Sequence, residues 1–231
     1  MNNFPKLRLS VAFLWVLFAF AINQTDAEAQ SQSVETNSAR GLESKIYEST
    51  SRIWQNDVGQ GFLPITQIFS VEVGVAPGMA TFGSRQAHDF ALLGLTYGRV
   101  LSNVLGEGHW YRGNFEGRLE LWGGGQYRPS SEYVIGFTPH IRYDFATGTR
   151  LVPFLDGGAG VTATSIGPPD MSGTFEFNLQ VNAGIYWFLR EHVALTGETG
   201  YMHMSCAGIH HPNLGANNVC FMFGVTWFFG T

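Results

Sequence analysis

From about Thr66 onward, apolar and polar positions alternate along runs that are separated by clusters of Gly, Pro, Asn and Asp. Alternation with a period of two is typical of β-strands. In residues 114–122 one face carries Phe115, Leu119 and Leu121, whereas the opposite face carries Glu116, Arg118 and Glu120. The pattern predicts eight strands, at residues 66–77, 88–102, 112–125, 131–145, 151–164, 173–190, 192–206 and 217–229.

Alternation alone does not say which face points inward, because a soluble β-sandwich would bury its apolar face. Several runs are much longer than the roughly 5–6 residues of a typical strand. The polar faces use Arg, Glu, Asn and Gln but no Lys, which favours a paired interior network over a solvated surface. Apolar residues facing lipid around a polar interior are typical of a membrane barrel. We therefore expect an all-β, eight-stranded antiparallel transmembrane β-barrel of the outer-membrane type, too narrow for a porin channel.

The composition supports an ordered and exported chain. Of 231 residues, 45% are hydrophobic, 14% aromatic and 13% charged, which excludes disorder over most of the chain. A mean hydropathy of +0.01 argues against a helical membrane protein. The net charge of −5 comes with no dense basic patch, so we expect no nucleic-acid partner. Lys occurs only at positions 6 and 45, which is unusual for a domain that is solvated on every side.

The N-terminus has the order of a secretory signal peptide. Lys6 and Arg8 precede the apolar run 9–22, and Ala27-Glu28-Ala29 fits cleavage before Gln30. A single N-terminal anchor helix is the alternative. We expect a signal peptide at 1–29, a polar leader at 30–65 and a barrel at 66–231 that lies in the cell outer membrane.

The seventh predicted strand breaks the apolar pattern near its end. His203 and Ser205 share the outward face, where residues two apart lie side by side. A His beside a hydroxyl is the minimum for an activated serine nucleophile. Asn217 begins the next strand with outward parity and is predicted to orient His203, as Asn does in Cys-His-Asn sites. The alternative is that His203 and Ser205 simply lie in the hydrated headgroup zone.

The connection that follows offers donors for an oxyanion. Gly208 supplies a backbone N–H and Asn213 a side-chain amide. Cys206 and Cys220 share inward parity on either side of this connection, so a disulfide and two unpaired buried thiols are both open. Neighbouring His210 and His211 lack the spacing of a metal site. We expect neither a metal nor a cofactor.

Three stretches together resemble the lipid A 3-O-deacylase (acyloxyacyl hydrolase) family. They are His203-Met204-Ser205-Cys206-Ala207-Gly208, Pro212-Asn213-Leu214-Gly215-Ala216-Asn217 and the closing Val225-Thr226-Trp227-Phe228-Phe229. Weaker similarity extends upstream through residues 143–148, 152–154 and 158–161. The resemblance implies an eight-stranded outer-membrane barrel that hydrolyses the ester-linked acyl chain at the 3-position of lipid A. It implies Ser205 as nucleophile, His203 as general base, Asn217 as orienting residue, and Gly208 and Asn213 as oxyanion donors.

Two positions depart from the family pattern. Cys206 stands where the family usually has Asn, and Asn217 where the best-known members have Glu. An amide cannot stabilise an imidazolium by charge, so the resemblance predicts lower activity. If Asn217 held the wrong imidazole tautomer, the loss could reach about 10⁴-fold.

Three hypotheses therefore remain on sequence grounds. The first is a serine esterase acting on lipopolysaccharide in the outer leaflet. The second is a non-catalytic small outer-membrane barrel, structural or adhesive, in which Cys206 and Asn217 mark a decayed site. The third is a soluble exported β-barrel that binds a small apolar ligand.

Overall fold

The computed structural model describes residues 52–230, which form nine strands and one antiparallel sheet. The signal-peptide prediction, and the leader as far as residue 51, lie outside the described residues. The strands are β1 (Gln67–Ala76), β2 (Gly78–Met79), β3 (Asp89–Val100), β4 (Gly113–Arg128), β5 (Tyr133–Phe145), β6 (Leu151–Thr164), β7 (Phe175–Arg190), β8 (Val193–Ser205) and β9 (Ala216–Phe229). Among the described residues, no helix is both long and apolar enough to cross a membrane.

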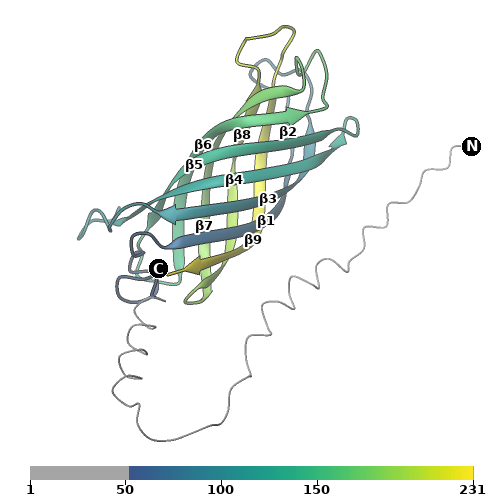
Figure 1. The fold of residues 1–231 in the computed structure, drawn as a ribbon. Coiled ribbons are helices and arrows are strands. Elements are labelled where there is room, and N and C mark those ends of the chain that lie inside the picture. The colour runs from purple at the N-terminus through teal and green to yellow at the C-terminus, as the bar shows by residue number, and fades with distance from the viewer. Residues whose placement is uncertain (1–51, 231) are drawn as a thin grey trace, which may run out of the picture. The chain divides into compact units, whose positions relative to one another are not determined.

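Eight long strands close on themselves as a barrel (Figure 1). Each strand from β3 onward pairs with the next one, and β1 pairs with both β3 and β9, so the barrel has no open edge. Full closure satisfies the backbone hydrogen bonds that lipid could not. The predicted eight-stranded barrel is confirmed. The ninth strand, β2, has only two residues, too few to show an alternating pattern in the sequence. It pairs Gly78 with Asn218 and Met79 with Asn217 of β9.

Apolar side chains lie on the outer wall and polar ones inside. Along β3, for example, Leu93, Leu95 and Tyr97 are exposed, whereas the intervening Thr96 is buried. The interior holds Arg142, whose guanidinium contacts Asp156, Glu198 and the Tyr186 hydroxyl. The soluble-barrel hypothesis requires the opposite arrangement and is wrong for this fold.

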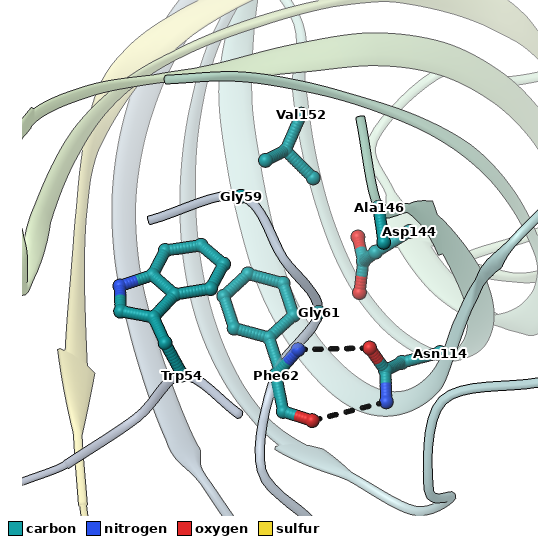
Figure 2. Close-up of a pocket in the computed structure, with 8 residues that line it drawn as sticks. All are labelled: Trp54, Gly59, Gly61, Phe62, Asn114, Asp144, Ala146 and Val152. Carbon is teal, nitrogen blue, oxygen red and sulfur yellow. Dashed lines mark hydrogen bonds between the residues drawn. The ribbon is translucent and has the colours of Figure 1, made fainter. Parts of the chain in front are cut away.

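One end of the barrel is closed by a segment that precedes β1, residues 53–63, which we call the plug. Its Phe62 donates from its backbone N to Asn114 Oδ1 at 2.9 Å and accepts from Asn114 Nδ2 at 3.2 Å (Figure 2). The Trp54 and Phe62 rings stack at 4.5 Å, and Phe62 also stacks on Phe228 at 5.2 Å. The cavity between the plug and the wall has no room for a water molecule.

The opposite end carries the connections 77–88, 129–132, 165–174 and 206–215. We call this end the site rim, because β8 and β9 bring the predicted catalytic residues there. The plug and the C-terminal end of β9 lie together at the other end (Figure 1).

Candidate active site

The last outward residues of β8 are Tyr201, His203 and Ser205. All three are partly exposed, while Met202 and Met204 between them are buried inside the barrel. Together with Thr199, which precedes them on the same face, they make the rim end of this strand polar, whereas the outer wall is mostly apolar. They lie at the site rim, where β8 ends.

Two hydrogen bonds join the three residues that the sequence predicted as catalytic. Ser205 Oγ lies 3.0 Å from His203 Nε2, and His203 Nδ1 lies 2.8 Å from Asn217 Oδ1. The register of β8 and β9 sets His203 opposite Asn217, which explains the second contact. The chain of contacts has the order nucleophile, base and orienting group that hydrolytic triads use.

The Asn217 side chain is held by three partners. Its Oδ1 accepts from the Tyr201 hydroxyl as well as from His203, and its Nδ2 donates to the Thr81 carbonyl at 2.7 Å. A carbonyl can only accept, so the amide nitrogen must face Thr81 and the amide oxygen must face His203. His203 therefore carries its proton on Nδ1, which leaves Nε2 free to accept the Ser205 proton.

The carbonyl of Thr81 is fixed by the connection between β1 and β3. It also accepts from the backbone N–H of Ser84 at 3.1 Å, across a turn in which Phe82 and Gly83 have positive φ. Asn218 anchors this connection by donating to the carbonyls of Ala76 and His88 at 2.8 and 2.6 Å. The connection consequently covers Asn217, which is only 1% exposed.

Gly215 lies close to Cε1 of the His203 ring. A Cβ at this position would meet His203 Cε1 at 3.1 Å and the Met204 carbonyl at 3.0 Å, and its φ of +72° is one that side chains rarely adopt. Only glycine allows the connection 206–215 to run this close to the imidazole. Gly215 therefore helps to define the position of the ring.

The two predicted oxyanion residues differ in their surroundings. Gly208 follows Ala207 in a pair of positive-φ residues, and nothing lies within 4 Å of where a Cβ would stand. Asn213 Nδ2 instead donates to Glu176 at 2.9 and 3.0 Å and to Ser172 at 3.2 Å. Both amide hydrogens of Asn213 thus have protein partners, and the oxyanion role of both residues stays a prediction.

Of the two possibilities left open for Cys206 and Cys220, the structure has the second: both cysteines are free buried thiols and no disulfide joins them. The strand register sets Cys220 opposite Gly200, six positions before Cys206. At about 3.3 Å per residue, this separation along the sheet far exceeds the reach of a disulfide. The parity of the two cysteines correctly predicted that both side chains are buried on the inner face, but it carried no information on the distance between them. Cys206 Sγ contacts the backbone of His210 instead, at 3.2 and 3.4 Å.

Four groups at the site went unassigned at the sequence level. Tyr201 has the same parity as His203 and could have been found by that signal. The carbonyl of Thr81 and Gly215 lie in connections whose path no periodicity predicts, and Glu176, near the start of β7, meets the site through Asn213 of the connection 206–215.

A cavity of about 490 Å³ is lined by Phe177, the register partner of Ser205 on β7, and by Cys206, which follows Ser205 in the chain, but not by Ser205 itself. Phe175, Phe177 and Ile209 give it apolar walls, and Ser172, Thr174 and His210 add polar groups. Its volume lies in the usual range of ligand pockets. Within residues 52–230, no group of three His, Cys, Asp or Glu side chains is arranged to hold a metal ion.

These features define a class: a closed membrane-type barrel whose outer wall carries a hydrogen-bonded Ser, His and Asn at one rim. Residues 93–226 match the model of the lipid A 3-O-deacylase (PagL) family, and the chain belongs to this family. The resemblance found in the sequence is thereby confirmed. No curated protein matches the sequence.

Solved structures with a similar barrel share little sequence with this chain. Neisserial surface protein A (NspA) has a TM-score of 0.51 at 13% identity, over 70% of this chain and 96% of that one. The outer membrane enzyme PagL has a TM-score of 0.45 at 20% identity, over 68% and 97%. The outer membrane protein OprG from Pseudomonas aeruginosa has a TM-score of 0.46 at 12% identity, over 76% and 100%. At these identities the likeness concerns the fold alone.

Proposed function

We propose that this protein is an outer-membrane serine esterase that removes the 3-O-linked acyl chain from lipid A. The observation that carries the proposal is the Ser205–His203–Asn217 chain of hydrogen bonds on the outer wall. Membership of the deacylase family supports the choice of substrate. No cofactor is needed, because the serine and the histidine together supply a nucleophile and a proton acceptor.

The chemistry follows from the tautomer of His203. Ser205 Oγ attacks the ester carbonyl carbon as His203 Nε2 takes the serine proton, and the resulting oxyanion is met by the backbone N–H of Gly208. His203 then gives the proton to the leaving 3-hydroxyl oxygen of the sugar, and an acyl-serine remains. Water, deprotonated by His203, attacks the acyl-serine, and His203 returns that proton to Ser205 Oγ as the fatty acid leaves.

The location of the site suits a substrate that is confined to a membrane leaflet. A lipid cannot enter an interior packed with side chains, but its ester linkage can meet the outer wall at the level of the headgroups. The cavity lined by Phe177 and Cys206, both neighbours of Ser205, has apolar walls for an acyl chain and polar groups from the rim connections. Because both ends of the described chain lie at the plug end, export followed by insertion from the periplasm would bring the site rim to the outer leaflet.

Mass spectrometry of lipid A tests the proposal. Cells or vesicles with the wild-type protein should lose one 3-hydroxyacyl chain, and Ser205→Ala should lower this rate by at least about 10³-fold. Thr199→Ala is the matched control, because it removes an exposed hydroxyl from the outer face of the same strand. Lipid A that keeps all its acyl chains with folded wild-type protein present would favour the non-catalytic barrel instead.

A further inference from the structure

We infer that position 217 is built for an amide, and that Tyr201 and the backbone carbonyl of Thr81 are the positioning groups that make Asn217 a competent partner of His203. The inference rests on the proposed esterase function and deepens it. It replaces the view that Asn217 marks a weakened or decayed site. The family match begins at residue 93, so the segment that contributes Thr81 lies before the matched residues.

The contacts around Asn217 complement an amide atom by atom. Its oxygen has two lone pairs, and two donors meet them, His203 Nδ1–H and the Tyr201 hydroxyl. Its nitrogen is met by an acceptor, the Thr81 carbonyl. All three partners approach a side chain that is 1% exposed, where water is not available to replace a lost contact.

The carbonyl of Thr81 decides the direction of the amide. With the amide reversed, Oδ1 would face that carbonyl at about 2.7 Å, with two acceptors in contact and no hydrogen between them. The carbonyl cannot turn away, because the backbone N–H of Ser84 also holds it. His203 consequently meets an acceptor at Nδ1, and the imidazole keeps the tautomer that a general base requires.

A carboxylate would fit this position less well than the amide. One carboxylate oxygen would accept from His203 and Tyr201, but the other would face the Thr81 carbonyl with no proton to share. The charge that a carboxylate brings to the imidazolium is therefore offset by a buried repulsion. The site thus orients His203 through three hydrogen bonds at Asn217 and without a buried charge.

Tyr201 contributes through Asn217 and not through the substrate. Its ring meets Phe82 edge-on, with centroids 6.4 Å apart, so the β1–β3 connection packs on the same group that caps the amide oxygen. Removing the hydroxyl leaves this packing intact but frees one lone pair of Asn217 Oδ1. The amide and the imidazole then have more freedom to rotate.

Enzyme kinetics on lipid A vesicles form the first arm of the test. Asn217→Asp should lower kcat by about 10- to 100-fold, the effect of leaving a charged group unsatisfied when buried. Tyr201→Phe should lower kcat by about 3- to 10-fold with KM unchanged, as expected for one neutral hydrogen bond. Tyr97→Phe is the control, because its hydroxyl also donates to an amide oxygen, Gln67 Oε1 at 3.1 Å, on a distant strand. An Asn217→Asp enzyme that is folded and as fast as the wild type would overturn the inference.

The second arm needs no substrate. ¹⁵N NMR of the histidine rings in detergent micelles, with His203 assigned by its loss in His203→Gln, should show protonated Nδ1 and unprotonated Nε2 in the wild type. Tyr201→Phe and Tyr97→Phe should both keep this tautomer, because the Thr81 carbonyl still sets the direction of the Asn217 amide. An Nε2–H tautomer in the wild type contradicts the inference. A correct tautomer in a protein that leaves lipid A intact instead contradicts the proposed function alone.

Discussion

Asn213 is the residue at which two roles meet. It lies in the connection after Ser205, and its side chain ties this connection to Glu176 on β7 and to Ser172 in the connection that precedes β7. Its side-chain oxygen Oδ1 accepts from the backbone N–H of Cys206 at 3.4 Å. Donating to an oxyanion requires the Asn213 amide to exchange one of these bonds when substrate binds, and catalytic contacts often tighten only in the complex.

Separate substitutions of Asn213 and Glu176 distinguish these roles. If Asn213 donates to the oxyanion, as we predict, Asn213→Ala should lower kcat on lipid A by about 10²- to 10³-fold. Glu176→Gln keeps the size of the side chain and one acceptor for Asn213, and it should change kcat by less than about 10-fold. Equal losses in the two variants would show that Asn213 only anchors the connection.

Sequence reasoning at the scale of residues succeeded where a strand sets the geometry. His203 and Ser205 are two apart on β8, and Asn217 is the register partner of His203, so parity and a short connection predicted their proximity. The orientation of the Asn217 amide could not be predicted. It depends on a backbone carbonyl 136 residues away in the sequence. Any residue type at position 81 supplies the same carbonyl, so the identity of that residue carries no signal.

At the scale of elements, alternation predicted the eight long strands because each has one face toward lipid and one toward a polar interior. The plug carries no such pattern. Trp54 and Phe62 stand only in short apolar pairs, with Ile53 and Leu63, at the two ends of a polar stretch, yet each is only 1% exposed. Their burial depends on the aromatic side chains inside one barrel end, including Phe188 and Phe228, and no local pattern reveals that contact.

Phe62→Ala should therefore destabilise the barrel without affecting the chemistry. Truncating a buried Phe usually costs about 3–5 kcal/mol, and the stacking partners Trp54 and Phe228 lose their contact as well. Urea titration of the protein in micelles measures the loss, and the specific activity of the folded fraction should stay that of the wild type. Trp110→Ala is the control, because this side chain is 87% exposed and its removal should change stability by less than about 0.5 kcal/mol. If the plug does not stabilise the barrel, Phe62→Ala and Trp110→Ala should have the same free energy of unfolding.

The whole molecule is organised by two opposed surfaces. The wall facing outward is apolar over the length of the strands, and the interior holds a network in which Arg142 and His140 meet Asp156. The scarcity of Lys follows from this arrangement, since neither surface is a solvated face. The candidate site stands on the apolar wall, which is where the proposed esterase would meet a substrate held in the membrane.

A pair of substitutions on β7 tests whether this wall lies in a bilayer. Val181 is 60% exposed near the middle of the strand, and Leu189 is 47% exposed near its plug end. In lipid vesicles, Val181→Arg should lower the free energy of unfolding by about 2–4 kcal/mol, whereas Leu189→Arg near the interface should lower it by only about 0–1 kcal/mol. In a wall facing water, both substitutions would have the same small effect. The dependence on depth is therefore the measurement that assigns the outer wall to lipid, and with it the route by which a lipid-borne ester reaches Ser205.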